Sequence, residues 1–344
     1  MGNRVTESLG AARWATWMLT GLATFQGTAL AVLQQAEQPA QEELPAITQP
    51  SRVVGRTAGP EEAAAWQQVQ AATDPGQRAQ LAQQFLMQFP DSGMTPHAHY
   101  VIAQYAYQSG DFSTFTTHAE EALKELPFAI DLLSQLAFLY AEQNEPDKAG
   151  NRATEALRVL ESLQRPAEVS PEIWVEQAYQ VRAEANYALG RAHLSRLRSG
   201  ARSDDPNLLQ AIEYFRTALR YDPRHDYAAF RLGFALRNVS DVDGALRAYG
   251  RAVAVGGVTA ELARGQIDEV LNIVKRAMPD SDWAKKSVDD VVAEAQAELL
   301  QETARVQAEK REEIDRLMMQ QMPAETPSGP GQGGGALPPT SPEG

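Results

Sequence analysis

Residues 226 to 259, DYAAFRLGFALRNVSDVDGALRAYGRAVAVGGVT, carry the pattern from which the fold is predicted. The small, bulky and helix-breaking positions are, in order, Leu232, Gly233, Leu236, Ala245, Tyr249, Ala252 and Gly257. Two antiparallel helices can approach closely only where the residues at their crossing are small. We therefore expect Gly233 and Ala245 to lie where two helices cross, with the bulky residues filling the space around them.

The same pattern recurs through the middle of the chain. A step of 34 residues back from the second half reaches Ala211, Phe215, Ala218 and Pro223. The first half of that copy carries Leu189, Gly190 and His193, 43 residues before their counterparts, so its two helices are separated by an insertion. We expect the insert SRLRSGARSDDPN to be an exposed loop, or an extra helical turn followed by a loop. Two further copies share a register, with Ile102, Ala103, Ala106, Ala119 and Ala122 recurring at Leu136, Ala137, Tyr140, Ala153 and Ala156.

This pattern resembles the tetratricopeptide repeat (TPR), a pair of antiparallel helices that recurs every 34 residues. The resemblance implies an all-α helical-repeat solenoid within residues 59–278, in which each repeat contacts only its neighbours. Repeats are expected near 62–90, 96–129, 130–163, 183–225 and 226–259, followed by a capping helix up to residue 278. The segment FLMQFPDSG before HAHYVIAQYAYQSGDF is similar to one in periplasmic TPR proteins of bacterial envelope assembly.

The N-terminus predicts export. Arg4 and Arg13 precede an apolar run, WATWMLTGLATFQGTALAVL, and Ala29-Leu30-Ala31 offers a small-x-small cleavage site. We interpret residues 1–31 as a signal peptide and 32–58 as a disordered linker, which places the protein in the periplasm or cell envelope. The alternative is an uncleaved membrane anchor, since the run of 20 residues could just span a bilayer.

The C-terminal part is expected to be a long polar helix over 279–322 and a disordered Pro- and Gly-rich tail over 323–344. Its apolar stripe starts at Val288, Val292, Ala295, Leu299 and Val306, fades, and returns at Ile314, Leu317 and Met318. We expect the first half to dock on the cap. The second half is either a solvated helix or a segment that pairs with another protein, and the break in the stripe near Lys310 favours a solvated helix.

Composition argues against several function classes. The net charge of -14 would repel a nucleic-acid backbone, so no nucleic-acid partner is expected. The absence of cysteine excludes disulfides, thiolate metal sites and a lipid-modified N-terminal Cys. His118 and Glu121 lie one helical turn apart and could supply two metal ligands, but a closed site needs about four. We therefore predict no enzyme activity, no cofactor and no metal.

The expected function is to bind a protein or peptide partner. In the resembling repeats the first helix lines a concave groove through positions 2, 5, 9, 12 and 13, and aromatic residues occupy some of these positions in every copy. Rigid aromatic area with a few arginines favours peptide binding. The groove residues we select are Tyr100, Tyr107, Tyr187, Arg191, Phe234 and Arg237. Phe138 and Phe234 could instead pack between repeats.

Three functions remain open at this point. The favoured one is a non-catalytic exported scaffold that acts in cell-envelope assembly or maintenance. The second is a membrane-anchored structural protein that forms oligomers through its C-terminal helix. The third is an enzyme or metal protein, which bound metal retained after purification would support.

Overall fold

The computed structural model describes residues 59–167, 169–198 and 202–321. The expected signal segment 1–31, linker 32–58 and tail 323–344 lie outside the described residues. Within them the chain is a series of helices with the following bounds: α3 Pro60–Ala71, α4 Pro75–Gln88, α5 Thr95–Gln108, α6 Phe112–Leu123, α7 Ile130–Glu142, α8 Pro146–Ser162, α9 Pro171–Ser195, α10 Pro206–Tyr221, α11 Asp226–Asn238, α12 Val242–Val255, α13 Ala260–Ala277, the short 3-10 helix η1 Asp282–Lys285, and α14 Val288–Gln321. No strand occurs in these ranges.

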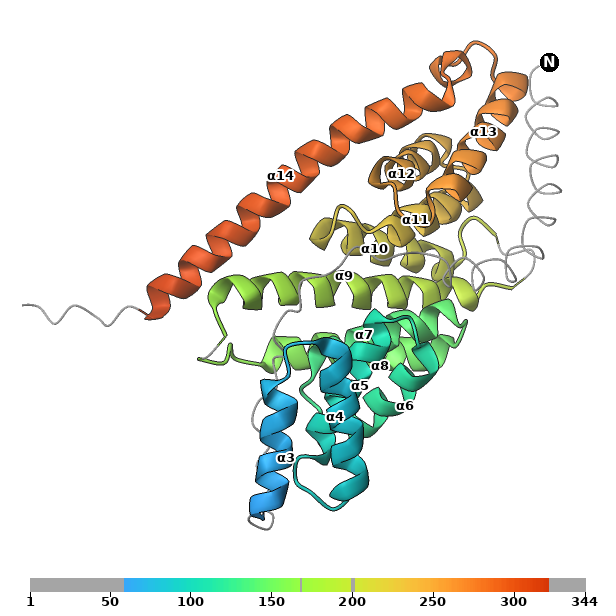
Figure 1. Cartoon of the computed structure of the whole chain (residues 1–344). Coiled ribbons are helices and arrows are strands. Elements are labelled where there is room, and N and C mark those ends of the chain that lie inside the picture. Colours follow the sequence, from blue (N-terminus) through green and yellow to red (C-terminus); the bar gives the residue numbers. More distant parts are fainter. Residues whose placement is uncertain (1–58, 168, 199–201, 322–344) are drawn as a thin grey trace, which may run out of the picture.

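The helices form successive antiparallel pairs (Figure 1). α5 pairs with α6, α7 with α8, α9 with α10 and α11 with α12, while α3 and α4 form a less extensive first pair. α13 packs on α12 and ends the series of pairs. This arrangement confirms the all-α helical-repeat solenoid predicted from the 34-residue pattern.

Short turns join the two helices of a pair, and their sequences explain where the helices begin and end. Gly110, Asn144 and Ser240 share one repeat position and adopt positive φ angles of 76°, 59° and 64°, which turn the chain sharply. The next helix then starts at an aspartate cap in two of these turns, where Asp111 accepts from the Thr114 amide and Asp241 from the Gly244 amide.

The expected close crossings are present in the last two pairs. A Cβ atom added to Gly233 would lie 2.7 Å from the Tyr249 ring, and one added to Gly190 would lie 2.6 Å from the Phe215 ring. Ala245 is fully buried at the same crossing as Gly233. The inserted segment between α9 and α10 is loop in its described parts, 196–198 and 202–205.

α14 corrects two expectations. Its first half packs chiefly on α12 rather than on the cap, because Gly250 lets Val291 and Ala295 approach the α12 backbone. Its second half is not a solvated helix: it reaches the N-terminal end of α9, where Val306 is buried and Lys310 pairs with Glu176 at 2.7 Å (Figure 1). The two ends of the apolar stripe therefore serve two different docking surfaces. None of the described helices is both long enough and apolar enough to cross a bilayer.

Candidate binding surface

The first helices of four pairs contribute side chains to one surface. α7 packs against α9, and α9 contacts α11. We define the inner surface by four residues of these helices and of α5: Tyr107, Phe138, Glu184 and Tyr227. The pattern of small and bulky residues buries one side of each first helix in its own pair and directs these side chains to the other side.

Aromatic contacts hold the inner surface together. The Phe138 and Tyr227 rings meet edge to face, with their centroids 5.3 Å apart. All three aromatic residues of the inner surface are half-buried rather than enclosed. Burial raises the pKa of Tyr107, and the nearby Glu184 and Tyr227 raise it further.

Two carboxyl groups on these helices each have one buried oxygen atom that is not satisfied within the described part of the chain. Glu184 accepts from Gln180 at 3.1 Å, yet its Oε2 is buried and has no hydrogen-bond partner in the described part of the chain. The same holds for Oδ1 of Asp131, whose Oδ2 accepts from Gln104 at 2.9 Å. Burial raises the pKa of both carboxyl groups. An unsatisfied buried acceptor is costly, so both carboxyl groups carry an energetic penalty within the folded chain.

A buried polar cluster centred on Glu142 lies beside the inner surface. Oε1 of Glu142 accepts hydrogen bonds from the Tyr187 hydroxyl and, at 3.1 Å, from Nε of Arg191. Nη2 of Arg231 lies 3.6 Å from Oε2. Burial by itself would raise the pKa of Glu142, but the Arg191 and Arg231 guanidiniums outweigh it, and the pKa is lowered.

This cluster corrects two of the selected groove residues. Tyr187 is fully buried and bonds to Glu142. The Arg191 side chain is only 13 % exposed, and it also donates to the Ala141 carbonyl at 3.3 Å. Both side chains join neighbouring helix pairs to each other, so neither is free to contact a partner.

The other four selected residues have different surroundings. Arg237 forms a bidentate ion pair with Glu269 of α13, at 2.8 and 3.0 Å. This pair connects the last helix pair to the cap, so the selection of Arg237 as a groove contact is corrected as well. The Tyr100 hydroxyl donates to Asp131 and leaves the ring half-exposed. Phe234 is half-buried against the C-terminal core, and Tyr107 belongs to the inner surface.

Sequence reasoning did not select Phe138, Glu184 or Tyr227 as contacts. All three stand at groove positions of the repeat, so the register contained the signal. The register does not show which arginines form ion pairs within the chain, because a paired arginine and an unpaired one occupy the same repeat position.

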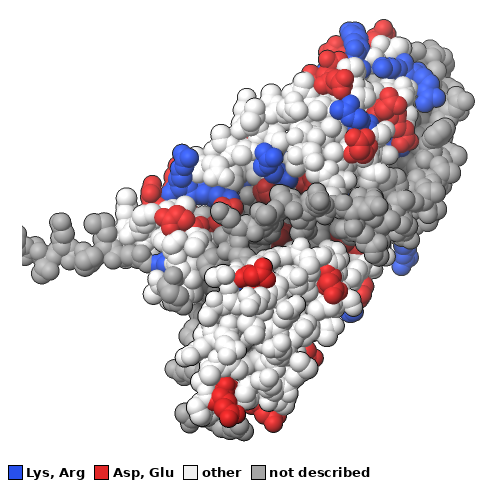
Figure 2. All heavy atoms as spheres, in the orientation of Figure 1, with Lys and Arg blue, Asp and Glu red and all other residues white. Residues whose placement is uncertain are grey.

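Charge is unevenly distributed over the molecule. On the face shown in Figure 2, Lys and Arg gather mainly over the half that holds α10 to α14. Arg78 and Lys124 are the only basic residues between 59 and 128. A partner that contacts both halves would therefore meet an acidic region and a region where basic and acidic side chains are mixed.

His118, which was considered together with Glu121 as a metal ligand, lies next to His99 in the structure. Nδ1 of His118 lies 2.8 Å from Nδ1 of His99, and the rings are 4.9 Å apart. Across the described ranges no three His, Cys, Asp or Glu residues are grouped so that they could hold a metal ion.

Comparison with known proteins gives weak similarities only. No protein-family model matches the chain, and no curated protein matches it. Yeast Tom70 is 16% identical with a TM-score of 0.42, over 64% of this chain and 41% of Tom70, so the match spans less than half of Tom70. PilF of Pseudomonas aeruginosa is 18% identical with a TM-score of 0.36, over 69% and 95% of the two chains. PilW, a widely conserved type IV pilus biogenesis factor, is 14% identical with a TM-score of 0.36, over 66% and 98%.

At these TM-scores the similarities support no inference about function. The fold class rests on the chain itself: a 34-residue register, antiparallel helix pairs and a small residue at the crossings. These features define an all-α helical-repeat protein whose repeat resembles the tetratricopeptide repeat.

Proposed function

We propose that this protein is a non-catalytic scaffold that binds an extended segment of a partner protein along its inner surface, and that it is exported to the cell envelope. One observation carries the proposal: aromatic rings on α5, α7 and α11 are half-buried on one surface, and those of Phe138 and Tyr227 meet edge to face.

A peptide supplies what this surface lacks. Its apolar side chains can cover Phe138 and Tyr227. Rigid aromatic rings provide contact area at a low cost in conformational entropy, because they have only two side-chain torsions to order.

The export part of the proposal rests on residues 1–31. Two arginines, an apolar run and a small-x-small site are the features of a signal peptide. Attachment to a membrane would depend on this segment remaining uncleaved. Function in envelope assembly or maintenance follows from this location and from the sequence similarity near FLMQFPDSG.

The alternative, oligomer formation through the C-terminal helix, has less support. In the second half of α14, which would form the pairing segment, Val306 is buried and Ile314 and Leu317 are partly buried against the core of the same chain. Pairing with a second chain would first require this helix to detach.

The proposal is tested by substituting aromatic residues in the tagged full-length protein and capturing its partner from crosslinked cells. Tyr107→Ala combined with Tyr227→Ala should reduce capture by on the order of tenfold or more, because buried aromatic contacts dominate such interfaces. Tyr105→Ala combined with Phe128→Ala is the matched control, because these rings are 41% and 43% exposed and lie outside the inner surface. Equal loss in both pairs, with unchanged helicity, would contradict the proposed surface.

A further inference from the structure

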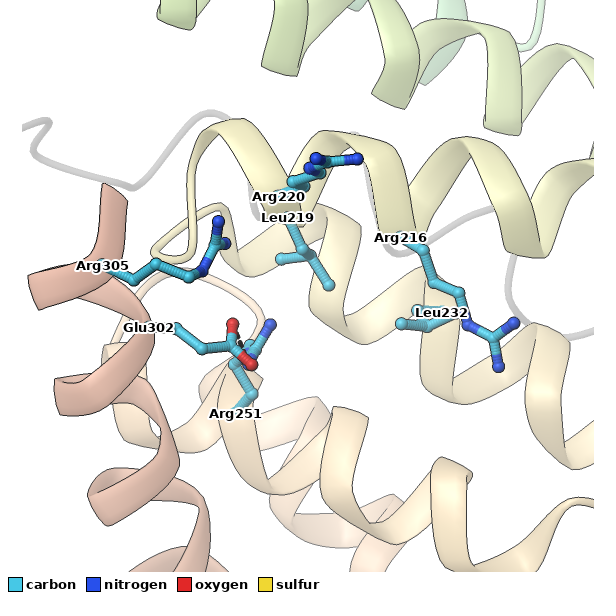
Figure 3. A pocket seen from close by; sticks show the side chains of 7 residues that line it. All are labelled: Arg216, Leu219, Arg220, Leu232, Arg251, Glu302 and Arg305. Carbon is cyan, nitrogen blue, oxygen red and sulfur yellow. Dashed lines mark ion pairs between the residues drawn. The ribbon is translucent and has the colours of Figure 1, made fainter. Parts of the chain in front are cut away.

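A cavity rich in arginine lies between α14 and the last helix pairs. It has a volume of about 270 Å³ and is lined by Arg216, Leu219 and Arg220 of α10, Leu232 of α11, Arg251 of α12, and Glu302 and Arg305 of α14. In Figure 3, Arg220 lies above Leu219, Leu232 lies beside Arg216, and Arg305 and Glu302 extend from α14 on the left. The cavity is separate from the inner surface, which is formed by the first helices.

The charges in this cavity are unbalanced. Glu302 is the only acidic lining residue, and Arg251 pairs with it at 2.5 Å with a side chain only 13% exposed. Arg216 and Arg305 pair with exposed neighbours on their own helices, Glu213 and Glu309. Exposed pairs of this spacing contribute only about 0.3 to 0.5 kcal/mol, so an incoming anion can displace them.

Arg220 has no hydrogen bond or ion pair with any residue of the described ranges, and it is exposed at the edge of the cavity. Although the whole chain has a net charge of -14, charges beyond the Debye length of about 8 Å are largely screened. The local surplus of guanidinium groups therefore decides which ligand is attracted. Guanidinium groups bind carboxylates through two parallel hydrogen bonds.

The volume of the cavity and its two buried leucines restrict which kind of ligand can fill it. A water molecule occupies about 30 Å³ in the liquid, so a single small oxyanion would leave most of the cavity unfilled. Leu219 and Leu232 are buried and offer an apolar floor. A ligand that fits both features has carboxylates beside an apolar side chain.

The chain contains one segment of this composition outside the described residues. Residues 37–47, EQPAQEELPAI, place Glu42 and Glu43 directly before Leu44. The residues between this segment and α3 could extend over roughly 40 Å. A tethered segment also has an effective concentration in the millimolar range, which favours its binding over that of a free peptide.

We propose that the cavity beneath α14 binds an acidic peptide segment, and that residues 37–47 of the same chain are this segment. Glu42 and Glu43 contact Arg220 and Arg305, and Leu44 packs on the leucine floor. Because Arg305 belongs to α14 and Arg220 to α10, the bound segment holds α14 against the helix pairs.

Introduced cysteines can test this contact, since the natural chain has no cysteine that would give a background reaction. The chain carrying Leu44→Cys and Leu232→Cys should form an intramolecular disulfide under mild oxidation. The matched control carries Leu44→Cys and Leu209→Cys, because Leu209 is 46% exposed on α10 and does not line the cavity. Thermal unfolding followed by circular dichroism confirms that each variant is folded.

Charge changes separate a specific contact from a random collision. In the Leu44→Cys, Leu232→Cys chain, Arg220→Glu with Arg305→Glu should lower the disulfide yield by at least about tenfold. Arg158→Glu with Arg311→Glu is the charge-matched control, and it should leave the yield unchanged, since neither residue lines the cavity. Glu42→Gln with Glu43→Gln should lower the yield like the cavity variant.

Three results would overturn the proposal. The first is a disulfide yield at Leu209 equal to that at Leu232, and the second is a yield at Leu232 that does not depend on Arg220 and Arg305. The third is the absence of any disulfide while added inorganic phosphate raises the melting temperature in an Arg220-dependent manner, which would assign the cavity to a different anion.

Discussion

Two glycines set how closely the helices of the last two pairs approach each other. Gly190 faces Phe215 and Gly233 faces Tyr249, and in each pair an added Cβ would lie less than 3.0 Å from the ring. Both rings are fully buried, so they have little room to move aside. These contacts explain why the repeat pattern has a small residue at this position.

Gly233→Leu should destabilise the last pair by about 1 to 3 kcal/mol, because the added side chain overpacks the crossing. Gly265→Ala on α13 is the control, since nothing lies within 4 Å of an added Cβ there. That control should stabilise the protein by up to about 1 kcal/mol through helix propensity. Urea unfolding measures both changes, and an unaltered midpoint for Gly233→Leu would refute the assigned register.

His99 and His118 give α5 and α6 a sensitivity to pH. Burial lowers the pKa of each, and the neighbouring Glu121 raises both only in part. Lys124 adds to the lowering at His99, and His99 itself adds to the lowering at His118. The unfolded chain therefore binds protons at a higher pH than the folded chain does. It follows that stability is lost as the pH falls below about 6.5, and the loss levels off below the folded pKa values.

We expect the melting temperature to fall between pH 7.5 and pH 5.5, and we expect a shallower fall in the variant carrying His99→Gln and His118→Gln. Glutamine keeps a polar side chain at both sites but takes up no proton in this range. Differential scanning calorimetry across the pH series gives the two slopes. Identical slopes would show that this pair does not control the pH dependence.

Among the helices, α14 differs most from what its sequence predicts. Its apolar stripe breaks near Lys310, and such a break favours a solvated helix. The break has a physical cause: α14 leaves α12 and docks on the N-terminal part of α9, where Lys310 lies over the Tyr179 ring at 5.2 Å and pairs with Glu176. A stripe that serves two surfaces need not keep one period.

Val306→Asp should detach the second half of α14. Loss of this buried contact costs about 2 kcal/mol, which corresponds to roughly a 30-fold faster hydrogen exchange of the amides from 303 to 317. The exposed Leu300 is the control position, and Leu300→Asp should leave exchange unchanged because that side chain is 73% exposed. Unchanged protection in Val306→Asp would mean that the docking on α9 contributes little.

At the scale of the whole molecule, Glu142 connects three successive helix pairs. Its carboxylate on α7 is paired with Arg191 on α9 and Arg231 on α11. The lowered pKa of this group means that its contribution to stability is present above the unfolded pKa and is lost as the pH falls through the folded pKa. This pairing resists acid until well below neutral pH.

Glu142→Gln should cost about 3 kcal/mol, because it leaves two buried guanidiniums without a countercharge. Glu145→Gln is the comparison, since Glu145 forms only an exposed pair with Lys148. That change should cost less than about 1 kcal/mol. Unfolding in urea at pH 7 distinguishes the two, and similar costs would show that the cluster does not join the pairs.

The sequence predicted the helix pairs well and the binding residues only in part. A 34-residue register fixes which side chains lie between paired helices, and this information suffices for Gly233, Ala245 and the turns. It also places Tyr187, Arg191 and Arg237 at groove positions. Whether such residues are free depends on carboxylates from neighbouring repeats, Glu142 and Glu269, and a register within one repeat does not contain that information.

The central claim is that a partner segment lies along the inner surface, and site-specific photo-crosslinking in intact cells tests it most directly. A photoreactive phenylalanine analogue replaces Phe138 in one variant and the exposed Phe128 in the other. The account predicts a crosslink to one protein from position 138, lost on Tyr107→Ala with Tyr227→Ala, and none from position 128. Crosslinks of equal yield from both positions, or none from 138 while the partner is still captured, would contradict it.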